Sequence, residues 1–139
     1  MTQQSMFRIP LNMPCLCGKE VEYATDVLKS VQLGHGSYIP RFEEMVAEAV
    51  GRRYGVAVSS GTAALHLALM AVGVGAGERV IVPDLTFVAT ANAVRYAGTW
   101  PIACDIDDQS WQMNLDLLRE FIEERCTYKR GEIFVSKWD

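Results

Sequence analysis

The chain has 139 residues, a length typical of one domain or of part of one. Half of its residues are hydrophobic and 22% are charged, a composition that indicates a globular fold and excludes a disordered, collagenous or coiled-coil protein. Seventeen acidic residues outnumber thirteen Lys and Arg residues, which gives a formal net charge of -4 at pH 7. Because there is no basic excess to neutralise a phosphate backbone, we expect no nucleic-acid partner.

No segment of the sequence is typical of membrane insertion or of secretion. The longest apolar stretch, Ala63–Gly75, is interrupted by His66 and is shorter than the roughly 20 residues that span a bilayer. The segment Met1–Pro14 has one basic residue and no continuous apolar run before a cleavage site, unlike a secretory signal. We therefore expect a cytoplasmic protein with no membrane partner.

The cysteines and histidines do not predict a metal site. One C-x-C pair and two isolated positions make up the cysteines: Cys15, Cys17, Cys104 and Cys126. No C-x-x-C pair or His-x-x-x-His motif accompanies them, and the two histidines lie in a Gly-rich loop (His35) and an apolar helix (His66). We expect reduced thiols and no bound metal, as in a reducing compartment.

Two amphipathic helices are predicted in the first part of the chain. Apolar residues at helical spacing predict the first over Lys19–Val31, and Gly34 supplies its stop. A Gly-rich turn follows over residues 33–38. Pro40 then marks the first position of the second helix, which is predicted to end near Gly55.

From residue 56 onward the patterns of strand and helix alternate. Short apolar runs predict three buried strands, over Val56–Val58, Val80–Val82 and Ile102–Cys104. Three helices are predicted with them, over Thr62–Val72, over Phe87–Tyr96, and from an Asn114 cap through Glu124. This alternation predicts an α/β fold with a largely parallel sheet and helices on its faces. The helix Thr62–Val72 is apolar nearly all round, so we expect it to be covered on most faces.

The strand–turn–helix segment Val56–Leu65 is the first candidate for binding a ligand. Gly61 lets the backbone turn tightly, and a helix of small residues begins there. A helix N-terminus offers unpaired amide donors and the positive end of the helix dipole to a phosphate, and the hydroxyls of Ser60 and Thr62 can add donors. The same residues are equally typical of a simple capped helix, since Ser and Thr are common N-caps.

A second candidate is the segment Pro83–Thr90, at the carboxyl end of the second predicted strand, where parallel sheets usually bind ligands. Phe87 can stack there on a flat ring, but taken alone it is as typical of a core residue, and Thr86 of a helix cap.

Two nucleotide-binding motifs are excluded. Gly73–Glu78 follows a helix and precedes a strand, the reverse of a dinucleotide-binding turn, and no P-loop motif occurs.

Taken together, four blocks of the sequence carry a resemblance to a known family. They are Ser59–Leu69, Gly73–Glu78 with Val80–Pro83, Thr86–Asn92 and Cys104–Asp107. In this order they resemble the DegT/DnrJ/EryC1/StrS family of aminotransferases, which depend on pyridoxal 5′-phosphate (PLP) and act on nucleotide-linked sugars. The resemblance runs from about Ile9 to about Arg125. It implies part of the large domain of a fold-type-I transferase, with a mainly parallel sheet and helices on both faces, and a homodimer with its sites at the subunit interface.

The resemblance also implies roles for individual residues. The family's phosphate-binding turn falls on Gly61, Thr62 and Ala63, and Phe87 matches the aromatic residue that stacks on the cofactor ring. The loop Gly34–Tyr38 loosely resembles a segment near the sugar-binding cleft. The implied partners are a keto-sugar nucleotide and an amino donor, and the implied reaction transfers an amino group between them for amino-sugar or cell-surface glycan biosynthesis.

Three other polar residues are expected to have structural roles. His66 is expected to pack within its apolar helix, and Asp105 and Asp107 to cap and brace the end of a strand, with a functional acid pair as the alternative for the two aspartates.

The chain also departs from the family pattern. The family's catalytic lysine and the acid that pairs with the pyridine nitrogen lie downstream of the matched blocks. None of this chain's four lysines is in a sequence context like that of the catalytic lysine: Lys19, Lys29, Lys129 and Lys137. We therefore expect no catalytic residue here and a truncated chain that is inactive alone.

Within that picture the chain is divided into three parts. An N-terminal helix and cleft loop are expected over residues 1–40, cofactor-binding βαβ units over 41–126, and a divergent tail over 127–139. The alternative function is a non-catalytic α/β binding or interaction module that keeps the fold without the chemistry.

Overall fold

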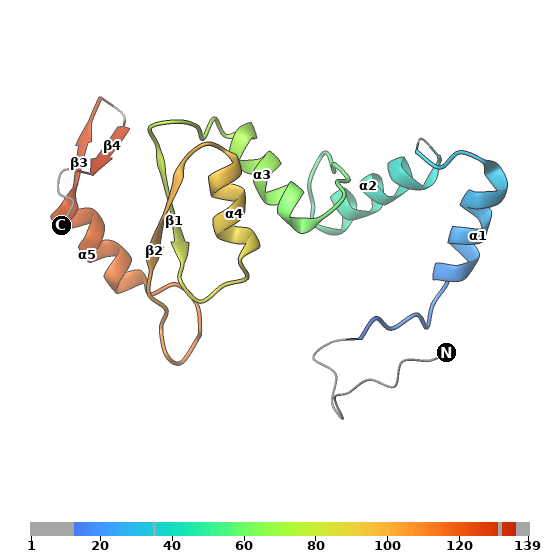
Figure 1. The fold of residues 1–139 in the computed structure, drawn as a ribbon, viewed down its shortest axis with the longest axis horizontal. Coiled ribbons are helices and arrows are strands. Elements are labelled where there is room, and N and C mark those ends of the chain that lie inside the picture. Colours follow the sequence, from blue (N-terminus) through green and yellow to red (C-terminus); the bar gives the residue numbers. More distant parts are fainter. Residues whose placement is uncertain (1–12, 35, 131, 136–139) are drawn as a thin grey trace. The chain divides into compact units, whose positions relative to one another are not determined.

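A computed structural model describes residues 13–34, 36–130 and 132–135 of the chain (Figure 1). It divides into two compact units, Met1–Ala57 and Val58–Asp139. Among the described residues, no helix is both long and apolar enough to cross a membrane.

The first unit contains the two predicted helices. Helix α1 spans Glu20–Ser30 and ends at Val31, whose backbone adopts the left-handed conformation with φ 59°. Helix α2 spans Tyr38–Ala49. It begins two residues before Pro40 because the first turn of a helix has no intrahelical partners for its amides, so proline is tolerated at any of its positions.

Helix α2 ends earlier than the predicted boundary near Gly55, because the chain turns through Gly51 at φ 64°. Gly55 instead allows the chain to pass close to α2, since a Cβ atom there would lie 2.5 Å from the carbonyl oxygen of Glu43 in that helix. The Glu43 carboxylate also accepts a hydrogen bond of 2.8 Å from the Ala57 amide.

The predicted strand Val56–Val58 is wrong for the described chain, in which these residues have no strand conformation. A strand requires a neighbouring strand to pair its amides and carbonyls. No such neighbour of this segment is found in the described residues, and its Ala57 amide is paired with the Glu43 side chain instead.

The second unit is built on two parallel strands joined by a helix. Strand β1 spans Arg79–Pro83, helix α4 spans Ala89–Tyr96 and strand β2 spans Trp100–Cys104. The strands pair in parallel from Arg79 with Trp100 to Pro83 with Cys104. This βαβ unit confirms the predicted parallel sheet, and α4 begins two residues later than expected because Phe87 belongs to the preceding loop.

The core of this unit lies between the strands and α4. Its most buried residues are Val82, Ala93, Val94 and Thr99. Thr99 is fully buried, and its hydroxyl donates a hydrogen bond to the Glu78 carbonyl. The Arg95 guanidinium donates to the Thr99 carbonyl at 2.9 Å and stacks 3.6 Å from the centre of the Trp100 ring. These contacts hold the amino ends of the strands against the end of α4.

Helix α3 spans Gly61–Ala71 and packs on α4, with the rings of His66 and Tyr96 at 5.9 Å between centroids. This confirms a packing role for His66. The expectation that α3 is covered on most faces is wrong for the described chain, where the side chains of Leu65, Leu67 and Met70 are 43–58% exposed. Within the second unit α4 covers one side of α3, and one neighbouring helix cannot cover an apolar surface that extends all round.

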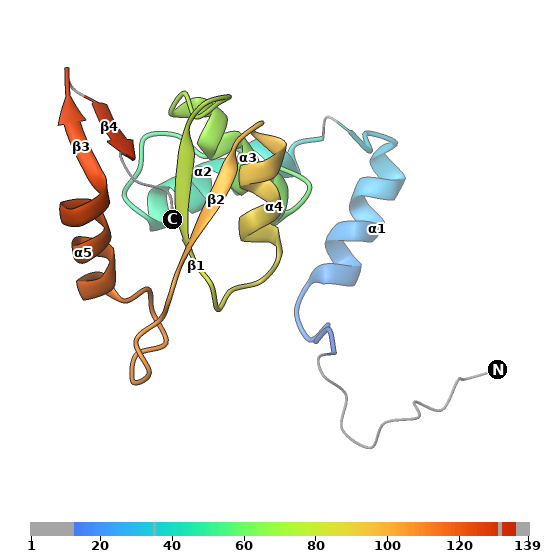
Figure 2. The ribbon, with the colours of Figure 1, turned by 60° about the vertical axis from the view of Figure 1, so that its left-hand side comes forward.

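The remaining elements lie on the other side of the strands from α4 (Figure 2). Helix α5 spans Leu115–Arg125, and an antiparallel hairpin follows it, with β3 over Cys126–Lys129 and β4 over Glu132–Val135. A groove between the sheet and these elements is lined by Ile81, Ile102, Phe121, Ile133 and Phe134, among others. Helices therefore flank both faces of the strands, as predicted, whereas the hairpin was not predicted.

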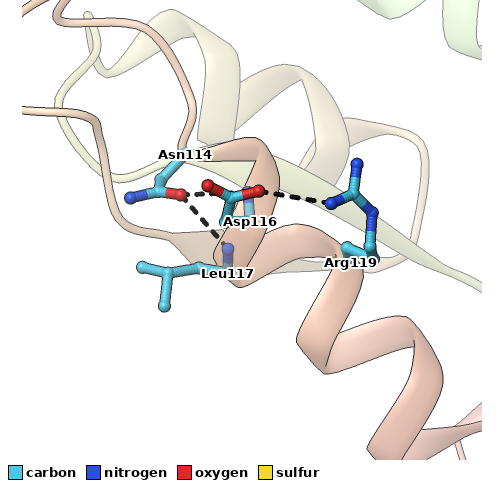
Figure 3. Close-up of polar contacts among 4 residues, drawn as sticks. All are labelled: Asn114, Asp116, Leu117 and Arg119. Carbon is cyan, nitrogen blue, oxygen red and sulfur yellow. Dashed lines mark hydrogen bonds and ion pairs between the residues drawn. The ribbon is translucent and has the colours of Figure 1, made fainter.

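Asn114 caps α5 as its sequence position predicts. Its side-chain oxygen accepts hydrogen bonds from the amides of Asp116 at 3.0 Å and Leu117 at 3.1 Å (Figure 3). Asp116 also forms an exposed ion pair of 3.3 Å with Arg119, one turn further along the helix. Exposed pairs of this kind add little stability, so the cap is the main polar contact that starts the helix.

Asp107 braces the loop that joins β2 to α5. Its carboxylate accepts hydrogen bonds from the amides of Ser110 at 2.8 Å and Gln109 at 3.3 Å, and these bonds lower the pKa of Asp107. The Asp105 carboxylate accepts from the Ile106 amide at 2.7 Å, and the Asp105 carbonyl accepts from the Asn114 amide at 2.9 Å. Both aspartates therefore have the expected bracing role.

We predict that Asn114→Ala lowers the free energy of unfolding by about 1 kcal/mol, because two amides of α5 lose their acceptor. Urea unfolding followed by circular dichroism measures the change. Asn114→Asp should retain most of the stability because a carboxylate also caps the helix. Equal loss in the two variants would contradict the cap as the cause.

We predict that the Asp107 loop loosens in acid. The pKa of Asp107 is lower in the folded loop than in an unfolded chain, so its carboxylate stabilises the loop at neutral pH, and this stabilisation is lost as the pH falls through the folded pKa. In an NMR titration, the chemical shift of the Ser110 amide should change with a midpoint below the ordinary Asp pKa of about 3.9. Asp107→Asn should abolish that transition, and a transition above the ordinary value would contradict the prediction.

Candidate functional site

The turn before α3 has the geometry of a capped helix N-terminus with amides to spare. Ser60 is extended at φ -164°, and its hydroxyl oxygen accepts a hydrogen bond of 3.2 Å from the Ala63 amide. The capping role that the sequence suggested is therefore present. Within the described residues, however, the amides of Gly61 and Thr62 donate no hydrogen bond. Two of the first donors of α3 thus remain available to a ligand.

The backbone of this turn is open at Gly61. A Cβ atom added to Gly61 would meet no other atom within 4 Å, so a ligand can approach the backbone here. The Thr62 side chain is partly exposed beside it. The Ser60 hydroxyl can still donate its proton while its oxygen accepts from Ala63. Free amides, hydroxyls and the positive end of a helix dipole together suit a phosphate dianion, which is the anionic end of PLP.

Phe87 lies in the loop that leads from β1 to α4. Its side chain is 79% exposed, so the interpretation of Phe87 as a core residue is wrong for the described chain. The loop starts where the Asp84 amide donates to the Cys104 carbonyl at 3.0 Å, one residue beyond the end of β1. An aromatic ring that is anchored next to a sheet and open to solvent is available for stacking.

Thr86 is not the cap of α4. The N-cap position of that helix is Val88, which makes no side-chain capping bond. The Thr86 hydroxyl instead forms a hydrogen bond of 3.0 Å with the hydroxyl of Thr90, in the first turn of α4. Thr90 was not singled out from the sequence, although a pair of hydroxyl residues four positions apart on either side of an aromatic residue was a usable signal.

Two loops leave the carboxyl edge of the strands (Figures 1 and 2). Residues 84–88 follow β1 and carry Phe87, and residues 105–113 follow β2. Ligands of parallel sheets bind at this edge because the loops that leave it converge there. The candidate phosphate turn at Gly61 begins α3, the helix that packs on α4. The second unit therefore contains both candidate segments.

The loop Gly34–Tyr38 belongs to the first unit, and its His35 lies outside the described residues. Tyr38 begins α2 and donates a hydrogen bond of 2.8 Å to the Asp26 carboxylate in α1. This hydrogen bond raises the pKa of Tyr38. The Tyr38 ring also lies 5.3 Å from that of Tyr23, measured between centroids. These contacts join the two helices, and a role in substrate contact stays a prediction.

The described residues contain no group of three or more His, Cys, Asp or Glu that could hold a metal ion. The four cysteines are unpaired thiols, exposed at Cys15 and Cys17 and partly buried at Cys104 and Cys126.

Two curated relatives share much of the sequence. A GDP-perosamine synthase of Escherichia coli O157:H7 is 44% identical over 126 residues, which cover 90% of this chain and 34% of the relative. A spore coat polysaccharide biosynthesis protein, SpsC, of Bacillus subtilis is 39% identical over 116 residues, which cover 84% of this chain and 29% of SpsC. The chain thus spans about a third of the length of the relatives that it matches.

Solved structures show the same fold. The Streptococcus pneumoniae protein Spr1654 has been solved in a PLP form and in a form with pyridoxamine 5′-phosphate (PMP). It superimposes with a TM-score of 0.72 at 30% sequence identity. The match covers 82% of this chain and 29% of that one. The fold is therefore part of a fold-type-I transferase domain, as the resemblance implied. The profile of the DegT/DnrJ/EryC1/StrS aminotransferase family matches residues 14–134, and the chain belongs to that family.

Proposed function

We propose that the chain is the cofactor-phosphate part of a PLP-dependent aminotransferase of the sugar-nucleotide type. The reaction transfers an amino group from an amino donor to a keto-sugar nucleotide, for the synthesis of amino sugars or cell-surface glycans. The observation that carries the proposal is the pair of amides at Gly61 and Thr62 that have no hydrogen-bond acceptor among the described residues, beside open space at the Gly61 Cβ position, in a chain of this family. The relatives named for GDP-perosamine and for a coat polysaccharide support the sugar substrate.

In this proposal the turn Gly61–Ala63 binds the phosphate of PLP. The amides of Gly61 and Thr62 donate directly to the phosphate, and the Ala63 amide is shared between Ser60 and the phosphate as a three-centre bond. The Thr62 hydroxyl adds a further donor. Glycine at position 61 is required because a larger side chain would occupy the open space that the phosphate needs.

Phe87 stacks on the pyridine ring in this proposal. When bound, PLP supplies the electron sink and carries the amino group, so the protein has to hold and orient its ring. The exposed face of Phe87 is the surface that the chain offers for this purpose, at the carboxyl edge where ligands bind. The turn would hold the phosphate of the cofactor, and Phe87 would support one face of its ring.

The proposal also assigns the rest of the chain. Residues 1–40 form the N-terminal helix and the cleft loop, 41–126 the cofactor-binding part, and 127–139 a divergent tail. The lysine and the acid of the family's chemistry belong outside the matched blocks, so these 139 residues alone should bind cofactor without transaminating. The full-length enzyme would be a homodimer in the cytoplasm.

We predict that Gly61→Val weakens the binding of pyridoxamine 5′-phosphate, because the isopropyl group fills the space in front of the free amides. This probe has the ring and phosphate of PLP but no aldehyde, so it cannot react with lysines. Thr62→Ala should have a smaller effect, at most about 1.5–3 kcal/mol, because it removes one donor to a charged group. Calorimetric titration measures both affinities.

Pyridoxamine, which lacks the phosphate, distinguishes the loss of phosphate contacts from a general loss of folding or binding. Gly61→Val should leave its affinity unchanged, because this compound has no group for the turn to bind. Gly75→Val is a matched control, since a Cβ atom at Gly75 also meets nothing within 4 Å. If Gly61→Val and Thr62→Ala both bind the phosphorylated probe with unchanged affinity, the phosphate-binding role of the turn is contradicted. That result would favour a simple capped helix in a non-catalytic module.

We predict that Phe87→Leu weakens the binding of both probes by a similar factor of about two to ten, because both contain the ring and the flat face is lost. Folding should survive, since the side chain is exposed. Phe42→Leu, in α2, is a control because it makes the same change at another exposed position. If Phe87→Leu unfolds the chain while the folded fraction binds normally, the stacking role is wrong.

A further inference from the structure

We propose that Thr90 is a positioning residue for Phe87, a role that rests on the proposed function. Thr90 holds the loop on both sides of the aromatic residue. Its amide donates a hydrogen bond of 3.0 Å to the Phe87 carbonyl. Its hydroxyl forms a hydrogen bond of 3.0 Å with the hydroxyl of Thr86, the residue before Phe87. One side chain and its own amide therefore fix the backbone around the stacking residue.

The ring of Phe87 needs this support because packing does not provide it. At 79% exposure the side chain has few neighbours in the described chain that could restrict it, so the direction of its Cα–Cβ bond depends on the loop backbone. The loop is anchored at its start by the hydrogen bond from the Asp84 amide to the Cys104 carbonyl. The contacts of Thr90 anchor its other end. A backbone held at both ends orders the ring before the ligand arrives, which reduces the entropy lost on binding.

A helix-capping role would place the hydroxyls differently. A capping hydroxyl accepts a hydrogen bond from an unpaired amide in the first turn of a helix. Here neither Thr86 nor Thr90 does so through its side chain, and the N-cap residue of α4, Val88, makes no side-chain capping bond. The two hydroxyls bond to each other across the aromatic residue. Their bond closes the loop rather than the helix end.

Thr90→Val tests the role, because valine keeps the shape and removes the hydroxyl. We expect about threefold to tenfold weaker binding of pyridoxamine 5′-phosphate and of pyridoxamine, the loss of one neutral hydrogen bond. The circular dichroism of the bound ring should also weaken, because a loosely held Phe87 no longer fixes its orientation. Thr90→Ser should restore both properties. Thr25→Val, at an exposed position of α1, is the matched control.

A double-mutant cycle identifies the Thr86 hydroxyl as the partner. Thr86→Val should weaken binding as much as Thr90→Val, and the double variant should be no weaker than either, because both single changes break the same bond. Fully additive losses would overturn the pairing. Each variant's free energy of unfolding is measured in parallel, and a binding loss that merely follows the unfolded fraction would overturn the positioning role.

The outcomes separate this inference from the proposed function. If the unaltered chain binds both probes saturably but Thr90→Val binds them equally well, the positioning role is overturned and the proposed function stands. If the unaltered chain binds neither probe, both are overturned. Weaker binding and weaker dichroism in Thr90→Val, restored by Thr90→Ser and absent in Thr25→Val, support the role.

Discussion

The parallel pairing of β1 with β2 is the interaction on which the second unit depends. Two parallel strands can be joined only by a crossover, and α4 is that crossover. Because the strands run in the same direction, both carboxyl ends reach the same edge, and the loops that carry Phe87 and Asp107 leave from it. The position of the candidate ring-binding residue therefore follows from strand direction and from nothing specific to Phe87.

The two ends of the sheet are stabilised in different ways. At the amino ends, the buried Thr99 hydroxyl and the guanidinium of Arg95 pair with backbone carbonyls, and Arg95 also stacks on Trp100. Of these groups Thr99 is buried, and its hydroxyl is hydrogen-bonded as a buried polar group requires. The carboxyl edge instead keeps exposed side chains and loops closed by their own hydrogen bonds. Loops at the carboxyl edge are where parallel sheets usually bind their ligands.

The candidate phosphate turn shows how one helix end can serve two purposes. Ser60 satisfies the amide of Ala63 and so begins α3, while the amides of Gly61 and Thr62 have no partner in the described residues. A cap on one donor therefore does not compete with ligand binding on the other two. For this reason the choice between a capped helix and a phosphate site, which the sequence left open, is not a choice between exclusive structures.

Local sequence was sufficient for helices α1 to α5 and for β1 and β2, but not for the hairpin of β3 and β4, although its contacts are local too. Asn114 starts α5 with an acceptor for its own next amides, and the apolar runs of β1 and β2 specify strands that one crossover can pair. Sequence alone also determined the family, through the order of its blocks. Tertiary structure decided whether Val56–Val58 forms a strand, because a strand needs a partner from elsewhere in the chain. It likewise decided that Phe87 is exposed and that Thr86 bonds to Thr90, because burial and side-chain pairing depend on which elements meet in space.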